Sequence, residues 1–278
     1  KKKKKKKKKK KMGKLRRIFS STLTFPPPPT LRLSKEKSHY LTNVLRLKLG
    51  EIVSLFNGGR EFLTEIVLMK PLVEVRVIEE KSDGIRLESP LRIHLIQSVV
   101  KGDKMDFMIQ KAVELGVVRI TPLFTPRTNV KLNEERLSSK MEHWKGVIES
   151  AAEQCGRRII PSLSSPISFN SFDQQFLDQQ FLEKEFEMNQ IDQDNKDFSS
   201  LVQSFVLHPD STNKISSLSF TEKNIRLLIG PEGGFSKEEI EKFQGFGFSK
   251  ISLGPRILRA ETATISALSI FQSKFGDI

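Results

Sequence analysis

Cysteine is nearly absent from this sequence, because Cys155 is the single cysteine among 278 residues. One cysteine can form neither an intramolecular disulfide nor a cysteine-rich zinc site. Histidine is also scarce: His39, His94, His143 and His208 are scattered along the chain, and no pair has the spacing of metal ligands. The sequence therefore predicts that no metal ion is bound.

Long apolar runs are missing as well. No stretch approaches the ~20 apolar residues that a membrane-spanning helix needs. A secretory signal is also lacking, because the segment after Met12 is basic and then reaches Phe25, which is followed by four prolines. We therefore expect a cytoplasmic protein with no membrane partner.

Acidic residues are outnumbered, but most of the excess comes from one end of the chain. The sequence holds 47 Lys and Arg against 33 Asp and Glu, a formal net charge of +14, and it opens with eleven lysines. Such a run cannot join a packed core, because like charges repel and nothing apolar is present to bury. It is a native basic arm, an expression tag or a placeholder for unassigned sequence. Because Met12-Gly13 resembles a translation start, we interpret residues 1–11 as non-native. Without them 36 basic residues face 33 acidic ones, a net +3, so overall charge does not by itself indicate a nucleic-acid partner.

Residues 12–88 have the pattern of a small β domain. Val73, Val75 and Val77 alternate with charged residues, as in a half-buried strand, and Asn57-Gly58-Gly59 is a hairpin signal. Short strands at this spacing predict a small β-barrel. A linker is expected at residues 89–90.

Residues 90–278 alternate between strands and helices, which indicates an α/β domain with a mainly parallel sheet. One helix is predicted to begin with Asp103 as its N-cap and to end at Gly116. A longer helix follows at 134–155, and Ser236 with Glu239 forms a capping-box pattern before a later one. Within this domain, residues 169–197 contain a near repeat and a run of Gln, Asp and Asn. We interpret this segment as a surface insertion and assign it no chemistry.

Three strands near the end of the chain lead into loops rich in Gly and Pro. The loops begin at His208-Pro209, at residues 230–234 with the sequence Gly-Pro-Glu-Gly-Gly, and at Gly254-Pro255. Ligands of open α/β sheets gather at the carboxyl ends of strands, so these loops are expected to form one pocket. The pattern is neither a dinucleotide fingerprint nor a phosphate loop. Taken alone, Gly-Pro-Glu-Gly-Gly is as consistent with a structural turn as with a ligand site.

The pairing of two of these loops resembles a known superfamily. Residues 229–234, followed by Leu-Gly-Pro-Arg-Ile-Leu-Arg-Ala-Glu-Thr-Ala at 253–263, resemble the last two motifs of the SPOUT methyltransferases. Within that superfamily the chain is most similar to the RsmE family, through residues 17–19, 39–46, 56–59, 101–104, 111–117, 127–128 and 153–157. The lysine run and the 169–197 segment depart from the family pattern.

The resemblance implies a C-terminal trefoil-knot methyltransferase domain and an N-terminal PUA-like RNA-binding barrel. It further implies that S-adenosylmethionine is the cofactor and that a specific uridine (uracil 1498) of 16S ribosomal RNA, in the small ribosomal subunit, is methylated at N3. A homodimer is implied, because two knots pack together in that superfamily.

The resemblance places the cofactor against three loops. The implied cofactor-binding residues are Leu207, His208, Gly230, Pro231, Glu232, Gly233, Gly234, Leu253, Gly254, Ile257, Leu258 and Thr262. Glu232 either binds the ligand or caps the following turn, and Thr262 either binds it or caps the last helix.

The remaining functional residues are charged. Arg127, Arg259 and Glu261 are the catalytic candidates; either arginine would stabilise a deprotonated uracil, or else would contact phosphate or form a salt bridge. The candidate RNA contacts are Arg16, Arg17, Arg46 and Lys48, although solvated surface charges would have the same pattern. Two other functions remain open: 2′-O-ribose methylation of RNA, and a non-catalytic RNA-binding or ribosome-assembly factor.

Overall fold

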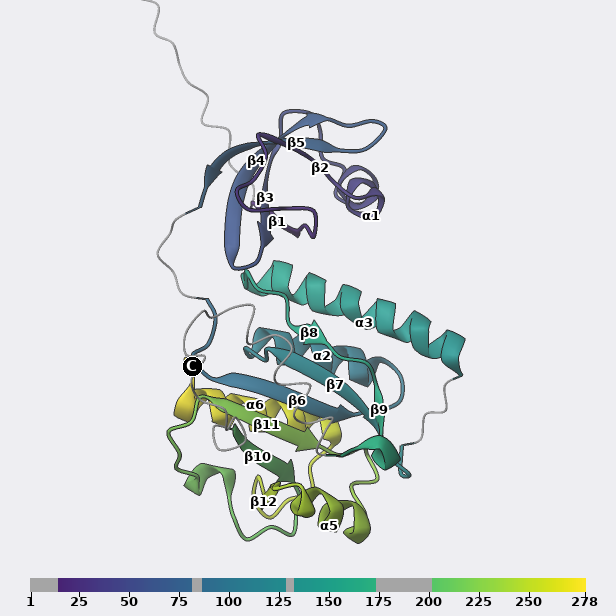
Figure 1. The fold of residues 1–278 in the computed structure, drawn as a ribbon, viewed down its shortest axis with the longest axis vertical. Helices are drawn as coiled ribbons and strands as arrows, with labels where there is room; N and C mark the ends of the chain where they lie inside the picture. Colours follow the sequence, from purple (N-terminus) through teal and green to yellow (C-terminus); the bar gives the residue numbers. More distant parts are fainter. Residues whose placement is uncertain (1–14, 82–86, 129–132, 174–201) are drawn as a thin grey trace, which may run out of the picture. The chain divides into compact units, whose positions relative to one another are not determined.

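The computed structural model describes residues 15–81, 87–128, 133–173 and 202–278, and it divides the chain into two units (Figure 1). The first unit comprises residues 1–85 together with 156–159, and the second comprises residues 86–155 and 160–278. The lysine run at residues 1–11 lies outside the described residues. Each unit is described by itself.

The first unit is built on a five-stranded mixed sheet in the order β1-β3-β4-β5-β2. Its strands are β1 (Arg16–Phe19), β2 (Thr30–Arg32), β3 (Ile52–Asn57), β4 (Arg60–Leu68) and β5 (Glu74–Glu80). β1 pairs with β3 in parallel, and the other pairs are antiparallel. The predicted hairpin turn is confirmed between β3 and β4, where Gly58 and Gly59 have φ of 51° and 82°, as a tight hairpin turn requires. Over the described residues the pairing runs as an open path, so the expected closed barrel is not established by these ladders.

A short helical segment interrupts this unit where only strands were expected. Helix α1 (Lys35–His39) begins after Ser34, whose hydroxyl accepts a hydrogen bond from the Lys37 amide, and the π-helix η1 (Tyr40–Val44) continues it. The segment is too short to show a helical periodicity in the sequence, and the fully buried Leu41 anchors it to the sheet.

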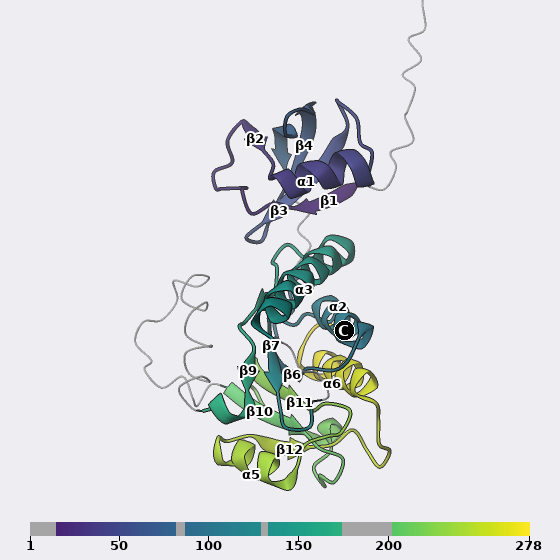
Figure 2. The ribbon, with the colours of Figure 1, turned by 90° about the vertical axis from the view of Figure 1, so that its right-hand side faces the viewer.

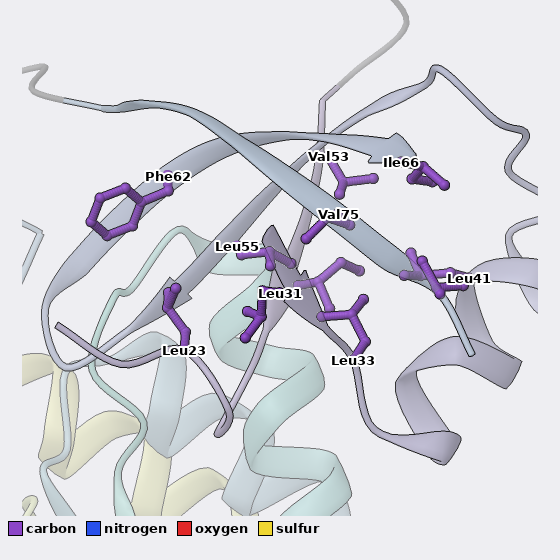
Figure 3. Packing of buried hydrophobic residues seen from close by; sticks show 11 residues of the cluster. Leu23, Leu31, Leu33, Leu41, Val53, Leu55, Phe62, Ile66 and Val75 are labelled. Atoms are coloured by element: carbon purple, nitrogen blue, oxygen red, sulfur yellow. The ribbon is translucent and has the colours of Figure 1, made fainter. Parts of the chain in front are cut away.

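The core of the first unit lies on one face of this sheet, under the helical segment (Figure 3). Val53 and Leu55 alternate along β3, and the same alternation brings Ile66 and Val75 from β4 and β5 to that face. Leu31 of β2 and the loop residues Leu23 and Leu33 also belong to the cluster. The predicted alternation of Val73, Val75 and Val77 is confirmed, because the first two lie in this cluster and Val77 packs against it.

The second unit contains a parallel sheet, as the sequence predicts. Its main order is β12-β10-β11-β6-β7-β8, with β9 pairing β7, and every described pairing is parallel. The strands are β6 (Arg92–Ser98), β7 (Arg119–Phe124), β8 (Ser162–Leu163), β9 (Ile167–Ser168), β10 (Val202–Leu207), β11 (Asn224–Ile229) and β12 (Ser249–Ile251).

Helices cover both faces of this sheet (Figure 2). They are α2 (Asp103–Glu114), α3 (Glu134–Cys155), α5 (Lys237–Gly245) and α6 (Ala260–Phe275), with short 3-10 turns η2 (Phe169–Ser171) and η4 (Ile215–Ser217). Ile96 of β6 packs in the cluster that contains Phe243 of α5, whereas the neighbouring Gln97 bonds Thr264 of α6. Since successive side chains of a strand point to opposite faces, α5 and α6 lie on opposite sides of the sheet.

The predicted helix caps are right in two cases and wrong in one. Gly116, with φ of 79°, follows the end of α2, and Ser236 with Glu239 forms the predicted capping box of α5. Asp103 is not an N-cap: that position belongs to Gly102, whose φ is 72°, and no side chain caps the helix. Asp103 is instead the first helical residue, where its negative charge favours the positive end of the helix dipole.

The predicted surface insertion does not begin at residue 169. Phe172 is fully buried and packs edge-on against Phe243 of α5, with Phe246 and Phe248 also in contact. Phe169 contacts the same Phe243 ring. Phe169 and Phe172 therefore pack into the core beneath α5, whereas residues 170, 171 and 173 are exposed. Residues 174–197 lie outside the described part of the chain.

Among the described residues, no helix is both long enough and apolar enough to cross a bilayer.

Candidate functional site

Three loops meet at the carboxyl end of neighbouring strands in the second unit. They follow β10, β11 and β12, and β10 lies between the other two strands in the sheet. The loops enclose a cavity of about 340 Å³. Its lining comprises Arg127, Leu207, His208, Pro209, Asp210, Ile229, Gly230, Pro231, Glu232, Gly233, Gly234, Phe235, Leu253, Gly254, Arg256, Ile257, Leu258, Ala260 and Ala263.

The loop after β11 is a tight turn that glycine makes possible. The Gly234 amide donates to the Pro231 carbonyl at 2.9 Å, and Gly234 has φ of 64°. At Gly230 a Cβ would come within 3.3 Å of the Phe235 ring, closer than nearly all real Cβ contacts. These glycines therefore leave the backbone of the loop exposed to the cavity.

Two cations contact this loop from outside. Arg127, in the segment after β7, donates from Nη1 to the carbonyl oxygens of Gly233 at 3.1 Å and Phe235 at 3.5 Å. Lys104, in the first turn of α2, lies with Nζ 3.5 Å from Oε1 of Glu232. The side chain of Arg127 is thus part of the cavity wall, and it holds the shape of the loop.

The loops after β10 and β12 are bonded to each other. The His208 amide donates to the Ile251 carbonyl at 2.8 Å, and the Ser252 amide donates to the Asn213 carbonyl at 2.8 Å. A hydrogen bond from the Ser211 hydroxyl to the Lys250 carbonyl, at 2.9 Å, adds a third link. The two loops therefore form one connected wall of the cavity.

Helix α6 closes the base of the cavity. Ala260 and Ala263 line it, and Thr264 one position further is buried, donating to Oε1 of Gln97 at 2.8 Å. This buried bond fixes the first turn of α6 to the end of β6. Glu261 lies in the same turn, and its Oε2 is buried without a hydrogen-bond partner among the described residues.

The structure brings nearly all of the residues expected to bind cofactor to one cavity. The exception is Thr262, which is exposed on α6 and does not line the cavity; it is not the helix cap either, since that position belongs to Arg259. Of the catalytic candidates, Arg127 lines the cavity, whereas Arg259 and Glu261 flank the wall formed by Ala260.

Sequence reasoning missed several residues of this lining. Asp210, Ile229, Phe235, Ala260 and Ala263 all contribute to it. Most lie inside or directly beside the predicted loops, so reading the loops as continuous segments would have included them. Ala260 and Ala263 are three apart on one helix face, and their small size is the signal that the helix approaches a ligand site.

The candidate RNA contacts of the first unit have different environments. Arg16, Arg46 and Lys48 are exposed. Arg17 instead donates from Nε to Oε1 of Glu61 at 3.0 Å, and its guanidinium lies 4.4 Å from the centre of the Phe56 ring. Arg17 is therefore not a solvated surface charge, because it forms an ion pair within the first unit.

The described residues contain no group of three or more His, Cys, Asp or Glu side chains that could hold a metal ion. The chemistry that this cavity offers is that of backbone amides and carbonyls, apolar walls, and a few charged side chains at its edge.

Comparison with known proteins identifies both parts of the chain. The RNA methyltransferase domain family matches residues 87–272, and the RNA methyltransferase PUA domain family matches residues 33–78. The chain is 36% identical over 247 residues to the ribosomal RNA small subunit methyltransferase E of Buchnera aphidicola (subsp. Acyrthosiphon pisum), covering 88% of each chain. It is 31% identical over 243 residues to the Bacillus subtilis protein of the same name, covering 87% of this chain and 89% of that one.

Solved structures give the same result. A methyltransferase from Legionella pneumophila, solved with its cofactor SAM, matches with a TM-score of 0.80 and 38% identity, covering 96% of this chain and 100% of that one. The ribosomal RNA small subunit methyltransferase E of Neisseria gonorrhoeae, bound to S-adenosyl methionine, matches with a TM-score of 0.74 and 28% identity, covering 95% and 99%. With these matches over most of its length, the chain belongs to the ribosomal RNA small subunit methyltransferase E family.

Proposed function

We propose that this chain transfers a methyl group from S-adenosylmethionine to N3 of one uridine, uracil 1498, of 16S ribosomal RNA in the small ribosomal subunit. One observation carries the proposal: a chain of this family has a cavity built from three glycine- and proline-rich loops at the carboxyl ends of adjacent parallel strands. This is where α/β sheets bind their ligands.

The cavity suits S-adenosylmethionine in its size and in its lining. About 340 Å³ lies within the roughly 300–1,000 Å³ of small-molecule pockets. Leu207, Leu253 and Leu258 supply apolar walls for a flat base, and the glycine backbone supplies amides and carbonyls that can read its edge. Asp210 and Glu232 add the negative charge that a cationic cofactor needs for binding. The proposed cofactor-binding residues do not include Thr262, because its side chain is exposed and does not line the cavity.

The protein's part in the reaction is alignment and charge stabilisation. When bound, S-adenosylmethionine supplies a methyl group that its sulfonium already activates, so the chain need not form a covalent bond. Arg127 keeps the glycine loop in place through the Gly233 carbonyl, which fixes one wall of the site. The positive charges of Arg127 and Arg259 stabilise a uracil that has lost its N3 proton. Glu261 has one buried carboxylate oxygen without a hydrogen-bond partner among the described residues. We assign this oxygen as a hydrogen-bond acceptor for the ligands at this wall.

The proposal extends to the topology and to the partners. β12 is an edge strand, yet the helix after it, α6, packs on α2 and β11, so residues 252–259 pass across the ends of β10 and β11. This path supports a trefoil knot. The match of residues 33–78 to a PUA family supports RNA binding by the first unit, through the exposed Arg16, Arg46 and Lys48. The homodimer is proposed from the superfamily resemblance, since one exposed apolar side chain, such as Ile257 at 89%, is ordinary on a protein surface. A ribosomal substrate supports a cytoplasmic location.

The test offers small ribosomal subunits that lack the modification to the protein, together with a labelled methyl donor, and then digests the RNA to nucleosides. We expect labelled 3-methyluridine. Labelled 2′-O-methyluridine without 3-methyluridine would replace the base with the ribose as target. Absence of label, together with no saturable heat in a calorimetric titration of S-adenosylmethionine, would instead identify a non-catalytic RNA-binding factor.

A further inference from the structure

A buried carboxylate in the first unit has no place in the proposed reaction. Glu61, in β4, is 1% exposed and accepts hydrogen bonds from the Ser54 hydroxyl at 2.6 Å, from Nε of Arg17 at 3.0 Å and from Nε of Arg158 at 3.0 Å. Nζ of Lys81 lies 3.5 Å from it. Burial alone would raise the pKa of Glu61, but the hydrogen bonds from Ser54 and Arg17 and the nearby positive charge outweigh it, so the pKa is lowered.

The contacts of Glu61 reach a segment that is distant in sequence. Arg158 belongs to residues 156–159, which lie with the first unit although the chain before and after them belongs to the second. Two backbone bonds reinforce the attachment: the Gly59 amide donates to the Arg158 carbonyl at 3.1 Å, and Nη2 of Arg17 donates to the Arg157 carbonyl at 3.0 Å. The four residues are thus held at the β3–β4 hairpin by hydrogen bonds to both backbone and side chain.

This attachment changes how the two units are connected. The chain leaves the first unit after residue 85, re-enters it at Gly156, directly after α3 ends at Cys155, and leaves again after Ile159. The units are therefore joined by three chain crossings, and two of them exist only while residues 156–159 stay in place.

We infer that Glu61 is a positioning residue: its ion pair with Arg158 keeps residues 156–159 in the first unit, and this attachment is coupled to binding of the RNA substrate proposed above. The second half of this inference rests on the proposed function, since only a large RNA substrate must engage both units in one complex. Binding of the cofactor within the second unit should not depend on this attachment.

The variants follow from the contacts. Glu61→Gln keeps the shape and part of the hydrogen bonding but removes the buried negative charge that lies against Arg17 and Arg158. Arg158→Met removes the partner on the segment and leaves Glu61 with Ser54, Arg17 and Lys81, so the sheet itself is spared. The matched control is Glu65→Gln on the same strand, which removes the ion pair with Arg76 on β5 instead.

Limited trypsin digestion of the full chain tests the attachment. Arg157 and Arg158 are cleavage sites, and Arg157 is 4% exposed. We expect cleavage at residues 157–158 to accelerate at least tenfold in Glu61→Gln, and after Arg157 in Arg158→Met, with Glu65→Gln cut at the wild-type rate. Wild-type cleavage rates in both variants would refute the attachment. Intact fluorescence of Trp144, and an unchanged dissociation constant for S-adenosylmethionine, confirm that the second unit is folded.

Methylation kinetics on small ribosomal subunits test the coupling. We expect KM for the subunit to rise at least tenfold in both variants with kcat little changed, and with KM for the cofactor unchanged. An unchanged KM for the subunit, in variants that trypsin cuts rapidly, would overturn the coupling. Inactivity of the wild-type chain would instead overturn the proposed function, and the protease result would still decide whether Glu61 holds the segment.

Discussion

His94 should make the stability of the second unit depend on pH between pH 7 and pH 5. The side chain is 2% exposed in β6, with Nε2 2.8 Å from the Thr121 hydroxyl of β7. Burial, and then the charges of Arg119 and Arg226 on the two flanking strands, hold the pKa of His94 well below its ordinary value of 6.5. The folded state therefore keeps His94 neutral while the unfolded chain takes up a proton.

The magnitude follows from this difference in proton binding. Because the folded pKa is depressed, stability is complete above pH 6.5 and falls as the pH drops below that value. With an unfolded pKa near 6.5, protonation at pH 5 favours the unfolded chain by at most about 2 kcal/mol, roughly 1.4 kcal/mol for each pH unit, a limit reached when the folded state takes up no proton at His94. Glu61 contributes little in this window, because its stabilisation is lost mainly as the pH falls below 4.5, the ordinary glutamate value.

Urea unfolding followed by tryptophan fluorescence measures this effect directly. Trp144 is the single tryptophan, is 2% exposed, and lies in α3 of the same unit, so its signal reports this unit alone. We expect the wild-type free energy of unfolding to fall between pH 7 and pH 5, with His94 contributing at most about 2 kcal/mol. His94→Gln, which keeps an amide beside Thr121, should lose much less, and His39→Gln, at an exposed position in the first unit, should behave as wild type. If His94→Gln lost as much stability as wild type, burial of a neutral histidine would not explain the acid sensitivity.

Three further substitutions address the cavity and the core. Gly234→Val should abolish measurable S-adenosylmethionine binding in calorimetry, because a φ of 64° is strained for a β-branched residue. The control Gly245→Val, at a position without positive φ, should keep that binding. Equal cofactor affinity in both variants would show that the pocket does not include Gly234. Phe172→Ala should lower the free energy of unfolding by about 3–5 kcal/mol in the urea assay, since the ring is fully buried; a loss below ~1 kcal/mol would mean that the ring is dispensable to the core. Gly116→Ala should cost more than the roughly 1 kcal/mol of backbone strain, because the new Cβ would also lie 2.6 Å from Nε2 of Gln272; a melting temperature equal to wild type would contradict this.

The sequence predicts the cavity loops well because their information is local. Gly230, Gly234 and Gly254 are required where the backbone turns sharply or approaches a neighbour, and such glycines are visible without any knowledge of the fold. The parallel sheet follows for a similar reason, since repeated strand–helix units imply it. The capping box at Ser236 is equally local, with donor and acceptor three residues apart.

What the sequence does not reveal depends on distant partners. Glu61 and Arg158 are separated by 97 residues, and nothing near either of them indicates the ion pair. Arg17 has the same pattern as a surface arginine until Glu61 is placed beside it. Phe172 begins a near repeat of polar character, and only α5 packing over it makes the ring part of the core. In each case the environment decides, and it comes from another part of the chain.

The return of residues 156–159 to the first unit also has a consequence during synthesis. The β3–β4 hairpin and Glu61 emerge from the ribosome long before Arg158, so the first unit cannot complete its hydrogen bonding when its own strands have been made. Translation at roughly 5–20 residues per second separates residue 85 from residue 156 by about 4–14 s. During that interval the Glu61 carboxylate lacks Arg158, one of its counter-ions. The N-terminal unit therefore reaches its final form only after α3 has been synthesised.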